Sequence, residues 1–483
     1  MKKNCILTLL LAAMLLQPMG LTGCAGDTTE TETTATTESV TETVGETALS
    51  DDLPERDFAG AEFRILSYET VNCNGIHVVE ESTGEGVNDA TFKINNAIEE
   101  RFNVVMTEML DADLCLTGIQ KTILAGDDAV DLNLPNTNSA FAFLQKNCVL
   151  NYNMLPYVDL DKPYWVSSMN KDVSIGGQYY YAFGGLDLSH LDYTHMMVFS
   201  KDMVTNYSLE NFYDLVKEGK WTLDKMEEAM SVVSYDPDVK KDEPTDIYGF
   251  VATPKQILPN FWEAAGAKSI DKDGDDSLYY AIPGNENFAT IVDHIFTLLW
   301  DTGYWKQTKS DTGVDEDMPT LMEEGRMLFG DTTFHYVKTL RDIDADFGLL
   351  PYPKWDDTQK DYMSRAEGGI RCPMVPITVS DPEYVSIILE ALSFAGYTEL
   401  VPAYFDVGLK GKVSRDEESA AMLDIIYDSR VYDLGDCIWV SDIRDGFILS
   451  MFKNNNRELA STVEKNRNKI ETELAEAMEI ANQ

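Results

Sequence analysis

Basic residues are scarce in this sequence. Its 483 residues include 38 lysines and arginines against 83 aspartates and glutamates, so the formal net charge is −45. A protein that binds nucleic acid needs a basic surface to neutralise phosphates, and this composition argues against one. The same excess of negative charge disfavours anionic ligands. We therefore expect a neutral small-molecule ligand and no nucleic-acid partner.

The motifs of common catalytic and nucleotide-binding sites are also missing. Only five histidines occur, and none lies in an H-E-x-x-H pattern. The chain has no G-x-S-x-G, P-loop or G-x-G-x-x-G motif. A glycosidase needs two carboxylates at a set separation, which a sequence does not reveal, so a surface carbohydrate-active enzyme stays an alternative. We expect a protein that is not an enzyme and has no cofactor.

Cysteine is rare, and its spacing predicts no metal site. The chain has seven cysteines, with no C-x-x-C pair and no zinc-like spacing. Cys5 and Cys24 belong to the N-terminal segment. The remaining five are expected to be buried free thiols, with one unassigned disulfide left open: Cys73, Cys115, Cys148, Cys372 and Cys437.

An acidic run at Asp271–Asp276 looks like a calcium-binding loop, because it contains D-x-D-G-D. An EF-hand loop that starts at Asp271 needs Glu at its twelfth position, where this chain has Ile282. Apolar residues flank the run on both sides, and Gly274 lies within it. This pattern favours a β-hairpin, and we expect no metal.

Only one long hydrophobic run occurs, and it lies at the N-terminus. Lys2 and Lys3 precede the apolar run Ile6–Leu16, which predicts a signal peptide over residues 1–23. Gly23-Cys24 matches the lipobox of bacterial lipoproteins, so Cys24 is the expected lipidation site (palmitate) and the new N-terminus. Residues 24–57 are rich in Thr and Glu and predict a flexible acidic tether. We expect an extracytoplasmic protein anchored to the cell membrane by this lipid alone.

Strands and helices alternate after the tether. The predicted strands are 62–66, 103–106 and 131–134, and helices are predicted between them, around Ile94–Phe102 and over 114–125. This β-α-β-α-β order is typical of an α/β fold with a mostly parallel sheet covered on both faces. Further along, the pattern predicts strands at 178–183, 194–199, 247–251 and 374–379, and helices at 383–395, 434–451 and 461–480.

The stretch 318–354 carries the clearest pattern. A short helix is predicted to end at Gly325, and Met327-Leu328-Phe329 then forms a buried strand. Gly330-Asp331 is predicted to turn the chain into a helix over 332–340, and the strand Phe347–Leu350 follows. In open α/β sheets, ligands lie beyond the carboxyl ends of the strands, so this turn is predicted to face a cleft.

These motifs, in this order, resemble those of the extracellular solute-binding proteins of ABC importers, the sugar-binding type (family 1). Gly325–Gly330 is similar to a G-K-A-A-M-like strand of that family, and Phe347–Pro353 is similar to its F-G-x-x-P-x-P segment. Ser200-Lys201-Asp202 stands for its N-K-D motif, and Lys220–Asp224 matches its helix start at T-W-D-E. Phe334 lies close to a position where the family often has Trp. The resemblance covers nearly everything from Phe58 onward.

The resemblance implies a two-lobed, periplasmic-binding-protein-like (type II) α/β fold. Residues 58–190 with 350–398 are expected to form the N-terminal lobe, and 191–349 with 399–483 the C-terminal lobe. The chain is expected to cross between the lobes near 186–194, 346–351 and 396–402. A monomer of this kind captures a sugar or oligosaccharide between its lobes and delivers it to ABC permease transmembrane subunits.

Sugar binding requires aromatic rings against C–H faces and polar side chains that pair with hydroxyls. The loops at the predicted cleft supply such residues, although for any single aromatic residue core packing is an equal alternative. The candidate ligand-binding residues are Tyr68, Glu69, Asn136, Asn138, Gln256, Trp262, Asp331, Phe334, Glu367 and Trp439. A peptide or other polar-solute binding protein is the alternative within this class, and a sensory or adhesive lipoprotein is one outside it.

Overall fold

Two sheets organise the part of the chain that the structure describes. The computed structural model describes residues 49–68, 77–236, 245–308 and 318–483. Predicted residue Glu69 and Cys73 lie outside these ranges.

The first sheet is parallel and has β1 (Ala61–Tyr68) at its centre. β2 (Val104–Asp111) pairs with all eight residues of β1, and β3 (Leu132–Leu134) pairs with its last part. Phe63 and Ile65 alternate with more exposed residues along β1 and are almost fully buried. The predicted strands and their parallel pairing are therefore confirmed.

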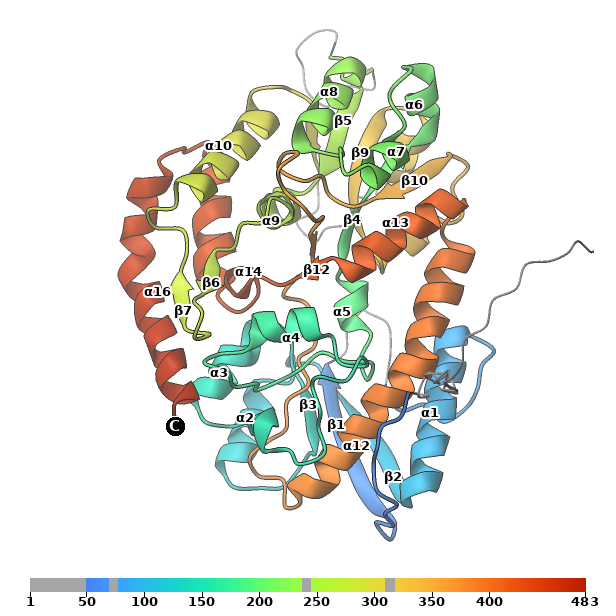
Figure 1. Ribbon diagram of the computed structural model, residues 1–483, viewed down its shortest axis with the longest axis vertical. Helices are drawn as coiled ribbons and strands as arrows, with labels where there is room; N and C mark the ends of the chain where they lie inside the picture. Colours follow the sequence, from blue (N-terminus) through green and yellow to red (C-terminus); the bar gives the residue numbers. More distant parts are fainter. Residues whose placement is uncertain (1–48, 69–76, 237–244, 309–317) are drawn as a thin grey trace, which may run out of the picture. The chain divides into compact units, whose positions relative to one another are not determined.

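Two helices pack close to this sheet (Figure 1). α1 (Gly86–Phe102) buries the apolar face that the sequence predicts, including Ile94 and Ile98. α12 (Pro382–Ala395) continues through two π-helical stretches, so one helical run extends from Pro382 to Lys410. This run is long and apolar enough to cross a membrane, but 72% of its most apolar window is buried inside the protein, as in a core helix.

The second sheet is mixed and has the order β10-β4-β9-β5-β8. β4 pairs antiparallel with both β10 and β9, whereas β5 pairs parallel with β9 and β8. The bounds are β4 (His195–Ser200), β5 (Tyr248–Ala252), β8 (Trp305–Gln307), β9 (Met327–Thr333) and β10 (Phe347–Leu350).

The remaining strands of the described ranges form two small, two-stranded sheets. β6 (Ile270–Lys272) and β7 (Leu278–Tyr280) form an antiparallel hairpin, which confirms the hairpin predicted at Asp271–Asp276. β11 (Ser364–Arg365) pairs parallel with β12 (Arg430–Val431).

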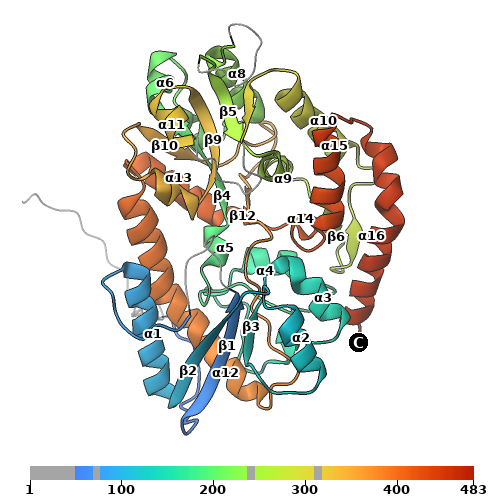
Figure 2. The ribbon, with the colours of Figure 1, turned by 180° about the vertical axis from the view of Figure 1, so that it is seen from behind.

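The remaining helices surround these sheets, and α16 packs against β7 and α3 (Figure 2). Their bounds are α2 (Thr117–Leu124), α3 (Ala140–Gln145), α4 (Ser167–Val173), α5 (Ser189–Asp192), α6 (Lys201–Asn206), α7 (Phe212–Lys217), α8 (Leu223–Val233), α9 (Pro254–Ala264), α10 (Glu286–Trp300), α11 (Met318–Glu323), α13 (Glu417–Asp428), α14 (Leu434–Cys437), α15 (Leu449–Lys453) and α16 (Leu459–Ala481).

The predicted turn at Gly330-Asp331 is wrong, and so is the helix predicted over 332–340. β9 runs through both residues to Thr333, and only Tyr336–Leu340 is helical, as a 3-10 helix. Thr332 and Thr333 are β-branched and pair with Met196 and His195 of β4, which extends the strand. Asp331 therefore lies inside the sheet and not in a loop after it.

Three other predicted elements are wrong or broken. No strand forms at 178–183 or 374–379, where the structure has only isolated bridges such as Ile175 to Gln178 and Val149 to Pro376. A proline cannot donate to a sheet ladder, which accounts for the second case. The helix predicted over 434–451 is divided into α14, a π-helix over Ser441–Ile448 and α15.

Candidate functional site

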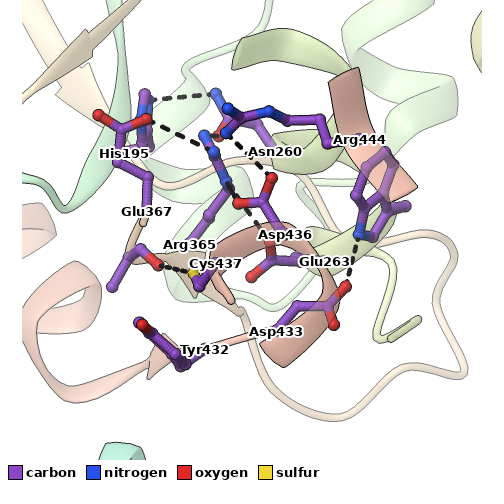
Figure 3. Close-up of polar contacts among 12 residues, drawn as sticks. His195, Asn260, Glu263, Arg365, Glu367, Tyr432, Asp433, Asp436, Cys437 and Arg444 are labelled. Atoms are coloured by element: carbon purple, nitrogen blue, oxygen red, sulfur yellow. Dashed lines mark hydrogen bonds and ion pairs between the residues drawn. The ribbon is translucent and has the colours of Figure 1, made fainter. Parts of the chain in front are cut away.

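Buried polar and charged side chains from several elements meet beside β4 and β9 (Figure 3). They come from the second sheet, from α9, from the segment 365–367 and from the residues around α14. We call this set the polar cluster. Its members are His195, Gln256, Asn260, Glu263, Asp331, Tyr352, Arg365, Glu367, Asp433, Asp436 and Arg444.

Among the described residues, only one of the two carboxylate oxygens of Asp331 has hydrogen-bond partners. Its Oδ1 accepts hydrogen bonds from the Tyr352 hydroxyl at 2.7 Å and the Asn260 amide at 2.9 Å, and lies 3.1 Å from His195 Nδ1. Its other oxygen, Oδ2, is buried and has no hydrogen-bond partner among the described residues. One carboxylate oxygen is thus fixed by the protein, and the other is left for a group that the described residues do not supply.

Arg365 connects Asp436 at α14 to Gln256 and Asn260 of α9. It is fully buried; its Nε donates to Asp436 at 2.7 Å, and its Nη1 donates to Gln256 at 2.8 Å and to Asn260 at 3.0 Å. Nη2 has no hydrogen-bond partner among the described residues. Such a cation stays buried because charged and amide groups surround it.

The carboxyls of the polar cluster differ in protonation. Burial strongly raises the pKa of Glu263, and the charge of Asp436 raises it further, so this side chain is a neutral acid. Burial also opposes the ionisation of Glu367, but the neighbouring His195 and the Arg365 charge outweigh it and lower the pKa to about 2. Glu367 is therefore ionised at neutral pH.

His195 carries positive charge more readily than a free histidine. Burial by itself lowers the pKa of His195, but the charge of Asp331 and its hydrogen bond, with the nearby Glu367, raise it overall. Its Nε2 lies 3.8 Å from a Glu367 oxygen, which is too far for a hydrogen bond, and is unpaired within the described ranges.

The segment 365–371 passes from the polar cluster to the loop after β3. Thr137 donates through its hydroxyl to the carbonyl of Gly368 at 2.9 Å, and Tyr68 donates to the carbonyl of Gly369 at 2.5 Å. A Cβ at Gly368 would lie 2.5 Å from the Asn138 side chain and 3.0 Å from the Cα atom of Cys437, so a larger residue would have to displace one of these neighbours. Tyr68 and the loop after β3 therefore lie next to the segment that contains Glu367.

The structure places the predicted site residues in three settings. Asp331, Gln256 and Glu367 belong to the polar cluster. Trp262 borders it, because it is fully buried and donates to Asp433 at 3.2 Å. Trp439 is buried against Phe141 with ring centroids 5.1 Å apart, and its Nε1 has no partner among the described residues.

The other predicted residues lie outside the polar cluster. Tyr68 is buried at the end of β1, Asn136 is half-buried and accepts from Ser139, and Asn138 is exposed. Phe334 is fully buried in the hydrophobic core, where it packs against Phe405. Its burial in an apolar environment indicates a packing role.

Sequence reasoning missed several members of the polar cluster: His195, Asn260, Glu263, Arg365, Asp436 and Arg444. Arg365 precedes Glu367 by two residues in a segment that the sequence analysis singled out, so its position was a usable signal. Asn260 and Glu263 lie three residues apart on α9 and share one helix face. His195 had no such signal, because only its pairing with β9 brings it to Asp331.

The polar cluster presents unpaired groups of both kinds. The unpaired nitrogens are Arg365 Nη2 and His195 Nε2, the unpaired acceptor is Asp331 Oδ2, and neither oxygen of the neutral Glu263 carboxyl has a partner among the described residues. Trp439 Nε1, outside the polar cluster, is a further unpaired donor of the described ranges. Leaving such groups buried and unpaired is costly, so the arrangement favours a bound polar molecule or water. Within the described ranges, no group of three or more His, Cys, Asp or Glu side chains is placed to hold a metal ion.

Solved structures with the same fold are numerous. The chain matches the cyclic alpha-maltosyl-1,6-maltose binding protein from Arthrobacter globiformis at 11% identity with a TM-score of 0.58, covering 86% of this chain and 99% of that one. It matches the GacH receptor of Streptomyces glaucescens, described in complex with acarbose, at 10% identity, a TM-score of 0.54 and the same coverage.

A third example is an ABC substrate-binding protein from Listeria monocytogenes in complex with cycloalternan. It has 12% identity and a TM-score of 0.51, again with 86% of this chain and 99% of that one covered. No model of a known protein family and no curated protein sequence matches this chain. The chain has the two-domain, periplasmic-binding-protein-like fold of these sugar-binding ABC substrate-binding proteins.

Proposed function

We propose that this protein is an extracytoplasmic substrate-binding protein that captures a neutral carbohydrate and delivers it to an ABC permease. One observation carries the proposal: the polar cluster buries donors and acceptors that lack partners among the described residues. Sugar hydroxyls both donate and accept, so they can satisfy groups of both kinds. The solved proteins of the same fold are named as binders of maltose-type and cyclic sugars, which supports a carbohydrate ligand.

The ligand site that we propose lies between two lobes, 58–190 with 350–398 and 191–349 with 399–483. The polar cluster draws on both lobes: Tyr352, Arg365 and Glu367 belong to the first, and its other members belong to the second. Tyr68, Asn136 and Asn138 of the first lobe contact the segment 365–371. Closure around the ligand is a hinge motion, and the ligand stabilises the closed form by its higher affinity for that form. The polar cluster acts in binding, and no catalytic step is assigned to it.

The N-terminal segment completes the proposal. Residues 1–23 act as a signal peptide, Cys24 carries the lipid, and residues 24–57 tether the folded part to the membrane. A monomer held in this way can meet permease subunits in the same membrane.

A ligand screen tests the proposal. The full-length chain is heated with mono- and oligosaccharides, including maltotetraose, and with peptides and polyamines. A sugar at 100 times its dissociation constant should add about 2.7 kcal/mol to the free energy of unfolding, which raises the midpoint visibly. A peptide as the only stabilising compound would favour a peptide-binding protein, and no response from any sugar would contradict the proposal.

A pair of tryptophan variants then locates the site. Trp439→Phe removes the unpaired Nε1 donor, and we expect the affinity for the identified sugar to fall by about tenfold, as for one lost hydrogen bond. Trp221→Phe is the control, because Trp221 is buried and donates to the carbonyl of Pro351 at 3.1 Å. The control should lose stability and keep its affinity. Equal affinity in both variants would show that Trp439 lies outside the site.

A further inference from the structure

If the protein binds a carbohydrate as proposed, the polar cluster also determines which ligands it accepts. Three of its members converge: Arg365, His195 and Glu367 (Figure 3). Arg365 Nη2 lies 3.5 Å from Glu367 Oε2, and His195 Nε2 lies 3.8 Å from the same oxygen. We call these three side chains the polar triangle.

The other nitrogens of Arg365 and His195 are already used. Arg365 Nε and Nη1 bind Asp436, Gln256 and Asn260, and His195 Nδ1 lies 3.1 Å from Asp331. The nitrogens that remain are Arg365 Nη2 and His195 Nε2, both buried and without a hydrogen-bond partner among the described residues. Both nitrogens lie near Glu367 Oε2 but outside hydrogen-bond distance of it.

The donors and acceptors of the polar triangle determine which hydrogen bonds a ligand can form there. The raised pKa of His195 favours the cation, in which both ring nitrogens donate. Glu367, with a pKa of about 2, only accepts. Glu367 is also the most exposed of the three, since its side chain is 14% accessible whereas those of Arg365 and His195 are at most 2% accessible. A ligand therefore meets one acceptor and two donors together.

We propose that the polar triangle selects a neutral hydroxyl and rejects a carboxylate or an amine at that position of the ligand. A hydroxyl oxygen accepts from Arg365 and His195 while its hydrogen is donated to Glu367. A carboxylate accepts from Arg365 and His195 but cannot donate to Glu367. Because Arg365 is already paired with Asp436 and His195 with Asp331, the carboxylate adds an unbalanced negative charge beside Glu367. An ammonium donates to Glu367 but cannot accept, and it lies beside two cations. Like charges placed together in a buried site are strongly unfavourable.

The test uses matched sets of sugars with the full-length chain. Each set has a neutral sugar, its uronic acid and its 6-amino-6-deoxy derivative, so that the carboxylate and the amine lie at the same carbon, for example glucose, glucuronate and 6-amino-6-deoxyglucose, with galactose and mannose sets alongside. Titration calorimetry gives the three affinities in each set. We expect the neutral member to bind at least about tenfold more tightly than either charged member, as for one lost polar contact.

Variants assign the selectivity to the triangle. Glu367→Gln removes the negative charge and keeps the size, so the preference for the neutral sugar over its uronic acid should shrink by about tenfold. Glu418→Gln makes the same change at an exposed residue paired with Lys217 and should leave the preference unchanged. His195→Gln removes one cationic donor and should weaken binding of the neutral sugar without creating a preference for the acid.

The outcomes separate this inference from the function on which it rests. If a uronic acid or amino sugar binds more tightly than its neutral parent, the triangle does not select a hydroxyl, although the protein still binds sugars. The same conclusion follows if Glu367→Gln leaves the ratio of neutral to acidic affinity unchanged. If no member of any set binds and the oligosaccharides are also inactive, the proposed function fails together with the inference.

Discussion

Among single residues, His77 shows how buried neighbours set the charge of a side chain. Its Nδ1 lies 3.0 Å from Glu108, and its Nε2 lies 3.0 Å from Asp187, which also pairs with Arg371 at 3.3 Å. Burial alone lowers the pKa of His77, but the two carboxylates outweigh it and raise the pKa to about 9. His77 is therefore a cation that ties β2 to the segment around Asp187.

This charge makes stability depend on pH. Because the pKa of His77 rises from 6.5 to about 9 on folding, its contribution is complete below about pH 6.5 and is lost as the pH rises through about 9. We expect wild type to exceed His77→Gln in free energy of unfolding by up to about 3 kcal/mol at the acidic end. Urea denaturation from about pH 6 to pH 10 measures this difference.

The control is His294→Gln. His294 pairs with Glu227, but about a third of its side chain is exposed, so solvent screens the pair. The loss in free energy of unfolding should therefore be smaller than for His77→Gln. A difference between wild type and His77→Gln that stays constant over the whole pH range would contradict the assignment.

Individual residues of the polar cluster also differ in how far the sequence alone predicts them. Glu367 was predicted from its place in the segment 365–369. Gln256 and Asp331 were predicted for the wrong reason, as a loop residue and a turn residue, because Gln256 lies on α9 and Asp331 lies inside β9. His195 was not predicted, because it reaches Asp331 only through the register of β4 and β9. Arg365 was not predicted either, although it lies two residues before Glu367, because its contact with Asp436 joins residues that are far apart in the sequence. Contacts between residues this far apart in sequence depend on tertiary packing, which hydrophobic periodicity does not encode.

At the scale of elements, two glycines bring the helical run Pro382–Lys410 against the chain that precedes α5. A Cβ at Gly396 would lie 1.9 Å from the carbonyl oxygen of Gly185, and a Cβ at Gly185 would lie 2.3 Å from the backbone nitrogen of Tyr397. Both positions fall near predicted crossings between the lobes. The backbones therefore meet without side chains between them.

Replacing Gly396 with a larger residue should lower the free energy of unfolding. Gly396→Ala forces the two backbones apart, and we expect a loss of about 1–3 kcal/mol in free energy of unfolding, as for an overpacked core. Gly408→Ala is the matched control, because it lies in the same helical run and its added Cβ would be 3.5 Å from the nearest atom. The control should be neutral or slightly stabilising, since Ala favours helix over Gly. Equal stability of the two variants in urea denaturation would contradict a tight contact at Gly396.

Elements were predicted well where periodicity alone determines them. The three strands of the first sheet, α1, α12 and the β6–β7 hairpin follow from alternation, apolar stripes and turn residues. The strand predicted at 374–379 did not form, although Met374, Val375 and Val379 are apolar and buried. Pro376 lies within the range and cannot donate to a sheet ladder, so the sequence itself contained the signal against a strand there.

For the whole molecule, net charge is the dominant electrostatic feature. The formal net charge is −45, so negative side chains repel one another in the folded state. Added salt shortens the Debye length and screens this repulsion. We expect the thermal midpoint of the full-length chain to rise as sodium chloride increases from about 10 mM to about 200 mM. A midpoint that falls over this range would mean that the surface ion pairs contribute more than the overall repulsion. Calorimetry at constant pH measures the midpoint.

The hydrophobic clusters described by side-chain burial do not follow the two sheets. One cluster contains Phe63 of β1, Ile388 of α12 and Leu349 of β10, and the other joins Phe143 of α3 to Phe250 of β5. The first cluster therefore draws on both sheets, and the second joins α3 to the second sheet. Because the first cluster spans both sheets, we expect a loss of packing at one sheet to disturb the other. Proteins of two domains often unfold in separate steps, and we expect this one to unfold as a unit.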